Sequence, residues 1–189
     1  MYNTLIILLR DSPSDRPLRI ERLWPTVDWT QIWINLWQAP VDQDTTATWY
    51  KVIHDILPTR VRLQAINRTP DDLCPHCGMV DTLPHRLTQC GDAPTQWEWA
   101  RSRIALILRT ESRWIPNTWL LHPQFRLWPP QRHRVILWVL ATFINFHTQK
   151  RTTLTRCDLH DFFQRAKRKL YHSPRRQTLA GNYLDVVRP

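Results

Sequence analysis

Apolar residues recur along most of the chain at spacings of three and four, the pattern of helices with one buried face. No alternating pattern typical of a strand competes, apart from the short run "LIILL" at residues 5–9. The same spacing favours core packing over base stacking for the tryptophans. The stripes comprise Trp29, Ile32, Trp33 and Leu36; Trp49, Val52, Ile53 and Ile56; Trp97, Ala100, Ile104 and Ile107; and Leu159, Phe162, Phe163, Ala166 and Leu170. We therefore predict an all-α fold, built as an irregular helical domain.

Capping residues predict where helices begin, because their side-chain oxygens can accept hydrogen bonds from the amide groups of the first turn. The predicted starts are Asp28 with Gln31 as its capping-box partner, a position near Thr45, Thr59, and Thr95 with Glu98. Pro40 and Pro58 are expected to end the first two helices. The helix after Thr59 is short, with Val61, Ala65 and Ile66 as its apolar positions.

Prolines interrupt residues 112–130, which predicts a loop with one short turn around Trp119. Two further helices are expected at about 131–148 and 155–171. The chain then divides into three regions. These are an irregular N-terminal lead-in at residues 1–25, a helical domain with a cysteine-rich loop at 26–110, and a helical C-terminal extension with a basic tail at 111–189.

The charge is strongly positive, with 26 lysines and arginines against 16 acidic residues and a formal net charge of +10. This excess favours RNA or DNA as partner over an anionic membrane surface. The alternative is a basic protein whose charge only aids solubility. The longest apolar run, Val135–Phe146, is shorter than the roughly 20 residues of a membrane span, so no membrane partner is expected. Residues 5–9 are too few for a signal peptide, which predicts an intracellular protein, nuclear or cytoplasmic and not secreted.

Three of the four cysteines and one histidine lie within the window "CPHCGMVDTLPHRLTQC". Their spacing is Cys74-x2-Cys77-x7-His85-x4-Cys90. Thiolate and imidazole suit tetrahedral Zn²⁺, and Gly78 can take the positive φ that turns backbone amides toward the sulfur atoms. Four protein ligands leave no position for water or substrate. The predicted Zn²⁺ in this small CCHC loop is therefore structural and not catalytic.

Two alternatives stay open from the spacing alone. A Cys74–Cys77 disulfide would leave the third cysteine of the window unpaired, and reducing compartments disfavour it. His76 also competes with His85 as the imidazole ligand. Cys157 lies far along the chain and is expected to be an ordinary half-buried thiol.

The surroundings of this window resemble the CCHC zinc-binding domain found C-terminal to the reverse transcriptase of non-LTR retrotransposons. The shared features are helices with Trp37 and Trp49, the "LPTR" turn at residues 57–60, "CPHCG" at 74–78, Asp81-Thr82 in place of the usual Glu-Thr, and then His85 and Cys90. The resemblance covers about residues 29–110. It implies a part of a retrotransposon polyprotein that helps a polymerase hold its RNA template or target DNA, with a reverse transcriptase domain as a further partner.

Catalytic motifs of such polyproteins are not found in the sequence, so the chain is predicted not to be an enzyme. A polymerase palm needs paired aspartates that bind two metal ions, but in "NYLDVV" Val186 follows Asp185. A restriction-like endonuclease needs Pro-Asp followed by Asp/Glu-x-Lys. Pro70-Asp71 is present, yet neither Asp-x-Lys nor Glu-x-Lys occurs in the chain.

Basic residues near the cysteine window and in the last helix are the candidate phosphate contacts, because guanidinium groups bind phosphate through two parallel hydrogen bonds. The candidates are Arg60, Arg62, Arg68, Arg86, Arg165, Arg168, Lys169, Arg175 and Arg176. The alternative is a solvated helix face without a partner. The run "RAKRK" at residues 165–169 also matches a nuclear-entry signal.

Together these features favour a non-catalytic, zinc-stabilised nucleic-acid-binding domain. The alternative is a structural or protein-interaction module that docks on a reverse transcriptase absent from this chain. That alternative predicts an exposed apolar patch around Trp24, Trp114 and Trp128.

Overall fold

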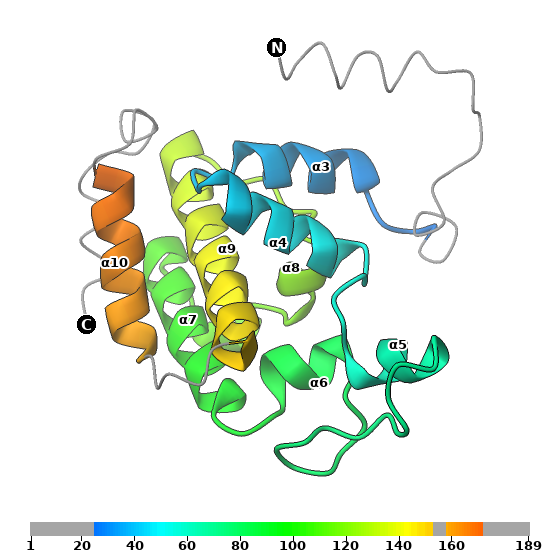
Figure 1. The fold of residues 1–189 in the computed structure, drawn as a ribbon. Helices are drawn as coiled ribbons and strands as arrows, with labels where there is room; N and C mark the ends of the chain where they lie inside the picture. The colour runs from blue at the N-terminus through cyan, green and yellow to red at the C-terminus, as the bar shows by residue number, and fades with distance from the viewer. Residues whose placement is uncertain (1–24, 153–157, 172–189) are drawn as a thin grey trace.

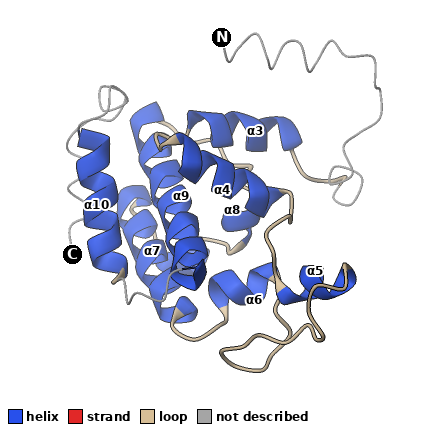
Figure 2. Cartoon of the chain, viewed as in Figure 1, coloured by secondary structure: helices blue, strands red, loops and turns tan. Residues whose placement is uncertain are grey.

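The computed structural model describes residues 25–152 and 158–171 of the chain (Figure 1). Helices are the only regular elements in this part, apart from an isolated antiparallel β-bridge between Leu73 and Val80 (Figure 2). They are α3 (Trp29–Gln38), α4 (Gln43–Ile53), α5 (Arg60–Ala65), α6 (Leu83–Thr88), α7 (Ala93–Leu108), the 3-10 helix η1 (Ser112–Trp114), α8 (Thr118–Leu121), α9 (Pro130–Thr152) and α10 (Leu159–Tyr171). The predicted all-α fold is confirmed. Residues 5–9, Trp24, Cys157 and the arginines of the tail lie outside the described residues.

Helix α9 lies at the centre of the bundle, with α3, α4, α7, α8 and α10 packed around it (Figure 1). Every residue from Val135 to Ile144 is buried. A helix that is covered on all sides needs apolar residues all round, which explains why this segment reads as a continuous apolar run. Within the described residues, no helix is both long and apolar enough to cross a membrane.

Most of the predicted apolar stripes face this core. The buried members are Trp29, Ile32, Leu36, Trp49, Val52, Ile53, Trp97, Ala100, Ile104, Ile107, Leu159, Phe163 and Leu170, while Trp33, Phe162 and Ala166 are partly buried against them. Core packing of the stripe tryptophans is therefore confirmed. One hydrophobic cluster contains residues from both sides of position 110.

The apolar positions in and next to α5 face solvent. Val61, Ala65 and Ile66 are all exposed, with 60% of Ile66 accessible. The helix has only six residues, none of them buried, and it projects from the bundle (Figure 1). Apolar periodicity in so short a helix therefore does not identify a core face. Ile56, the last predicted member of the α4 stripe, is exposed as well.

Two of the predicted helix starts are confirmed. The Asp28 side chain accepts a hydrogen bond from the Gln31 amide at 2.9 Å, and the Thr59 hydroxyl accepts one from the Arg62 amide at 3.3 Å. The second hydrogen bond of the predicted capping box, from the Asp28 amide to the Gln31 side chain, is replaced by another. The Asp28 amide donates instead to the side chain of Gln124, 96 positions away, a partner that local sequence does not indicate.

The other two starts lie earlier than predicted. Helix α4 begins at Gln43, because Asp42 is the residue whose carboxylate accepts from the Thr45 amide, at 2.9 Å. Helix α7 begins at Ala93, which places Thr95 and Glu98 inside the helix. Proline is tolerated in the first turn of a helix, where its missing N–H is not needed, so "APTQ" starts this helix before the expected cap.

A buried asparagine links α3 to the loop before α9 and to α9 itself. Asn35 is fully buried, and its amide nitrogen donates to the carbonyl oxygens of Pro123 at 2.5 Å and Phe125 at 2.7 Å. Its side-chain oxygen accepts from the side chain of Gln31 at 2.7 Å and lies 2.8 Å from His133 Nε2. Since that oxygen only accepts, Nε2 of His133 carries a proton and is the donor.

His133 predicts a loss of stability in acid. Burial, followed by the positive charges of Arg126 and Arg134, lowers the pKa of His133 from the usual 6.5 to about 4. Between pH 6.5 and pH 4 the histidine of the unfolded state binds a proton, whereas the buried one does not, so protonation favours unfolding. The folded protein is therefore more stable at pH 7 and loses this stability as the pH falls from 6.5 to 4. The expected loss is about 2–3 kcal/mol of unfolding free energy.

The comparison of wild type with His133→Gln in urea at pH 7 and pH 4.5 measures this loss. Glutamine keeps an N–H donor toward Asn35 but does not titrate, so the variant should lose less stability between the two pH values. Release of metal in acid is common to both proteins and cancels in the comparison. Equal losses in the two proteins would contradict the assignment.

Candidate metal centre

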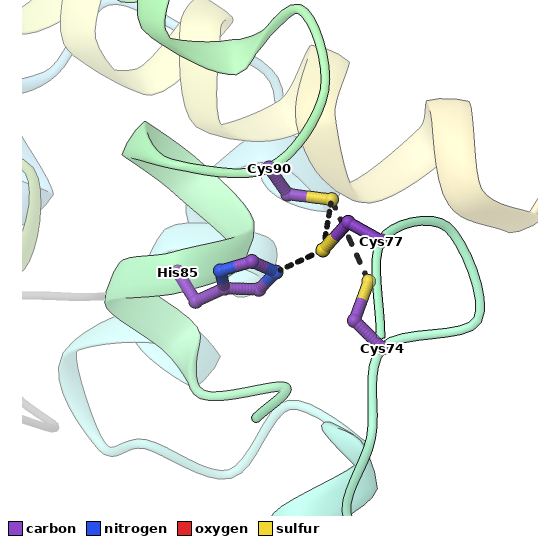
Figure 3. A group of neighbouring side chains, drawn as sticks. All are labelled: Cys74, Cys77, His85 and Cys90. Carbon is purple, nitrogen blue, oxygen red and sulfur yellow. Dashed lines mark hydrogen bonds between the residues drawn. The ribbon is translucent and has the colours of Figure 1, made fainter. Parts of the chain in front are cut away.

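Four side chains converge at one end of the molecule in the arrangement of a metal site (Figure 3). The ligand atoms of Cys74, Cys77, His85 and Cys90 all lie within 4.8 Å of one another. Cys74 Sγ is 3.5 Å from Cys90 Sγ, Cys77 Sγ is 3.9 Å from Cys90 Sγ, and Cys77 Sγ is 3.3 Å from His85 Nε2. Tetrahedral Zn²⁺ with Zn–S bonds of about 2.3 Å places its sulfur ligands about 3.8 Å apart. These residues therefore fit the metal that their chemistry implies.

The first two ligands lie on a tight turn that the backbone holds closed. The Gly78 amide donates to the Cys74 carbonyl at 2.9 Å, and the Cys74 amide donates to the Met79 carbonyl at 2.7 Å. Gly78 has a φ of +72°, as the sequence predicted, and a side chain there would be strained. The β-bridge between Leu73 and Val80 closes the base of the turn.

The other two ligands lie on a short helix, which the sequence did not indicate, and just after its end. His85 is on α6, whose first turn is capped by the Thr82 hydroxyl accepting from the His85 amide at 3.2 Å. The Cys90 amide then donates to the His85 carbonyl at 2.9 Å, which fixes the two ligands relative to each other. Leu83 and Leu87 of α6 belong to the main hydrophobic core, so this half of the site is anchored in the bundle.

The electrostatic surroundings favour the thiolate form of Cys74. Burial alone raises the pKa of the Cys74 thiol, but hydrogen bonds from the backbone amides of His76 and Cys77 and contacts with His85 and Cys90 lower it to about 6. The thiolate is the form that binds metal, so the turn prepares this ligand at neutral pH. Amides directed at the sulfur are the feature that the position of Gly78 predicted.

The alternatives to a metal site find no counterpart in the structure. Cys74, Cys77 and Cys90 are not joined by disulfide bonds, and Cys90 Sγ lies 3.5 Å from Cys74 Sγ and 3.9 Å from Cys77 Sγ, beyond the roughly 2.05 Å of such a bond. His76 is exposed and is not part of the cluster, whereas His85 is buried within it. Among the described residues, a Cys₃His cluster is thus present at the predicted positions.

A buried ion pair next to the metal site connects the helix that carries His85 to α5. Asp81 is fully buried, and its carboxylate accepts from the Arg60 amide at 2.8 Å and from Arg86 Nε at 3.2 Å. Arg86 Nη2 makes a further ion pair with Asp81 and donates to the Pro58 carbonyl. One carboxylate therefore joins the first residue of α5 to the helix that carries His85. Sequence reasoning noted Asp81 as part of a motif but gave it no role.

We predict that Asp81→Asn weakens metal binding by about 10–100-fold, the usual effect of losing a group that orients metal ligands. Removal of one partner from a buried pair also leaves Arg86 uncompensated, at a cost of about 3 kcal/mol of stability. Competition with a colorimetric zinc chelator measures the affinity, and urea unfolding measures the stability. Asp71→Asn, an exposed acid on the same loop, is the matched control. Equal zinc affinities for the two variants would contradict this role.

The predicted phosphate-binding residues fall into two separate groups. Arg60, Arg62 and Arg68 lie on or beside α5, and Arg165, Arg168 and Lys169 lie on α10. These helices are at opposite sides of the molecule (Figure 1). All of them except the partly buried Arg60 are exposed.

Two of the nine candidates cannot be placed, and one has a different environment. Arg175 and Arg176 lie outside the described residues. Arg86 directs its guanidinium toward Asp81 and Pro58, and only 14% of its side chain is accessible. Its position suits support of the metal loop better than contact with a phosphate backbone.

The centre offers four protein donors, the number that fills a tetrahedral metal site. Cys74, His85 and Cys90 are buried, and only Cys77 reaches the surface. A bound metal would therefore be enclosed by protein donors, as in structural zinc sites. No family model, curated protein or solved structure matches this chain. The fold and the Cys₃His cluster are therefore the basis of the proposed function.

Proposed function

We propose that this protein is a non-catalytic, zinc-stabilised nucleic-acid-binding domain that derives from the C-terminal part of a non-LTR retrotransposon polyprotein. In that setting it would assist binding of the RNA template or target DNA by a reverse transcriptase. The observation that carries the proposal is a closed Cys₃His cluster next to α5 and its arginines, in a chain with a formal net charge of +10. A closed site gives the metal a structural role, so the exposed basic side chains are the groups left to act on a partner.

The exposed cations suit a polyphosphate partner. Arg68 and Arg168 are exposed and have no acidic neighbour among the described ion pairs. Arginine binds phosphate in a fixed planar geometry, and several such contacts along a strand release condensed counterions. Binding of this kind depends strongly on salt and weakly on sequence.

Fluorescence anisotropy with labelled single-stranded RNA and with duplex DNA, each titrated at several salt concentrations, tests the proposal. We expect measurable affinity at low salt and a linear fall of log K with log[salt]. For the single strand, each lost phosphate contact should reduce the slope by about 0.7. Arg68→Gln and Arg168→Gln should therefore each weaken binding uniformly across sequences. Absence of binding to both nucleic acids at low salt would end the proposal.

Arg113→Gln is the matched control for these variants. Arg113 is also exposed, but it is already paired with Glu111 at 2.7 Å, so its loss should leave the salt slope unchanged. A similar effect of all three substitutions would indicate binding through overall charge, without a defined path for the strand.

A protein-docking function is the second candidate, because two large apolar side chains face solvent. Trp128 is 82% exposed and Trp114 is 67% exposed. Exposed tryptophans are typical of interaction surfaces, and this candidate predicts self-association of the isolated protein. Sedimentation at increasing concentration separates the two candidates, because a protein that stays monomeric and binds RNA fits only the first.

A further inference from the structure

A solvent-open pocket of about 380 Å³ lies where α4, α9 and α10 meet, far along the chain from the metal ligands. We call it the α10 pocket. Its volume is within the roughly 300–1,000 Å³ of sites that hold small organic ligands. Neither the zinc cluster nor the α5 arginines contribute to it. It is therefore a feature that the proposed function leaves unexplained.

The walls of the α10 pocket are mainly apolar and include aromatic side chains. Trp138 of α9 and Phe162, Ala166 and Leu170 of α10 are among the lining residues. Trp138 and Leu170 belong to the buried core, so this wall is part of a packed and rigid surface. An apolar lining with aromatic members suits a planar ring.

Polar side chains also line the pocket, next to the apolar ones. Thr142 and Asn145 of α9 and Thr45 of α4 line the pocket, and the Asn145 amide donates to the Thr45 hydroxyl at 2.8 Å. That hydrogen bond fixes the orientation of the amide. Amide and hydroxyl groups beside an apolar wall match a ring that carries donors and acceptors along its edge, as a nucleobase does.

The mouth of the pocket is positively charged. Arg165 and Lys169 lie one turn apart on α10 and both line the opening, and both are exposed. Asp42 holds the Lys169 amine near the mouth, with 3.8 Å between Lys169 Nζ and a carboxylate oxygen. Basic side chains outnumber acidic ones among the residues that line the pocket. A phosphate group attached to the bound ring would meet that charge.

We propose that the α10 pocket binds one nucleoside phosphate, with the base against the apolar wall and the phosphate at Arg165 and Lys169. An acyl chain would cover the apolar lining but offer no group to the cations at the mouth. A carboxylate of an acidic peptide would satisfy the cations but leave the wall uncovered. The nucleoside phosphate could be a free mononucleotide or one residue of a single strand. In the second case the proposal rests on the nucleic-acid-binding function, with which it shares Arg165 and Lys169.

Titration of the zinc-loaded full chain, labelled with ¹⁵N, tests the pocket directly. The probes are adenosine 5′-monophosphate (AMP), adenosine, ribose 5-phosphate and a single-stranded RNA 12-mer. We expect AMP to shift the Asn145 side-chain amide and Trp138 indole signals, with a dissociation constant of about 10–100 μM for a ligand of this size. Adenosine should bind more weakly, and ribose 5-phosphate should not shift the Trp138 signal.

Variants separate the roles of wall and mouth. Ala166→Trp fills the pocket from α10 and should weaken AMP and adenosine binding at least tenfold. Lys169→Met should weaken AMP binding about fivefold, a typical effect of one exposed charge, and leave adenosine unchanged. Lys51→Met, an exposed lysine of α4 outside the pocket, is the control and should change neither. Full AMP affinity in Ala166→Trp would overturn the proposal.

The titration with RNA distinguishes a free mononucleotide from one residue of a single strand as the ligand. It also separates this proposal from the proposed function. Shifts of the pocket signals by RNA that disappear in Ala166→Trp identify a residue of a strand as the occupant. Shifts by AMP but not by RNA identify a free mononucleotide. RNA binding that neither shifts these signals nor responds to Ala166→Trp, together with no AMP binding, would refute the pocket and leave the proposed function intact.

Discussion

Removal of the metal is expected to lower the thermal unfolding midpoint by about 8–16 °C. A ligand present at about 1,000 times its dissociation constant stabilises the folded state by about 4 kcal/mol, and a chain of this size loses about 2–4 °C for each kcal/mol. The effect should be local at first. Amide signals from Leu57 to Ala93 should lose their dispersion in chelator, whereas those of the α9 core should keep it, because α9 draws its stability from packing against several helices. Calorimetry and NMR with and without chelator give the two readouts.

Cys77→Ser reproduces the loss without chelator and isolates the contribution of the metal. Cys77 is the exposed ligand, so its replacement removes little packing and mainly removes a thiolate. His76→Asn is the matched control, because His76 is an exposed residue of the same turn and lies outside the cluster. We expect one Zn²⁺ per chain in wild type and in His76→Asn, and a much weaker site in Cys77→Ser. Protein that purifies without metal, yet unfolds cooperatively and at the same temperature in chelator, would contradict a structural metal.

The metal ligands and the main helices could be predicted because their signals are local. Trp97, Ala100 and Ile104 follow the period of a helix that buries one face, and each is buried in the structure. The four ligands lie within 17 consecutive residues, so the spacing of thiols and imidazole was enough to identify the cluster. The positive φ of Gly78 could be predicted for the same reason, because the tight turn after Cys77 requires it.

Short elements were predicted less well because a few residues do not define a period. Helix α6 has six residues and begins with Leu83-Pro84, which favoured a loop, although proline is compatible with a first turn. Helix α5 has the same length, and none of its residues is buried. The two helices are anchored differently, because Leu83 and Leu87 of α6 join the main hydrophobic core.

Contacts between distant segments gave no signal in a single sequence. Asp81 is one of many acidic residues until the fold brings Arg60 and Arg86 to its carboxylate. The α10 pocket likewise exists only where α4, α9 and α10 meet, and Thr45 and Asn145, which bond to each other there, are 100 positions apart. Polar side chains that look unremarkable along the chain thus organise both the metal centre and the candidate ligand site.

Asn35→Ala should be among the most destabilising single substitutions in the molecule. It leaves the carbonyl oxygens of Pro123 and Phe125 and the Nε2–H of His133 without their partner, and each unsatisfied buried group costs about 1–3 kcal/mol. We expect a total loss of about 4 kcal/mol, or about 12 °C in the unfolding midpoint. Urea and thermal unfolding of the zinc-loaded protein measure the loss.

The matched control is Gln38→Ala on the same helix, which removes an exposed side chain and should change stability by less than about 0.5 kcal/mol. If Asn35→Ala costs no more than this control, the segment from Pro123 to Phe125 does not depend on the asparagine. If the loss is as large as expected, a single polar side chain holds the loop before α9 against α3. The central helix, around which the other helices pack, would then be positioned by hydrogen bonds as well as by its apolar surface.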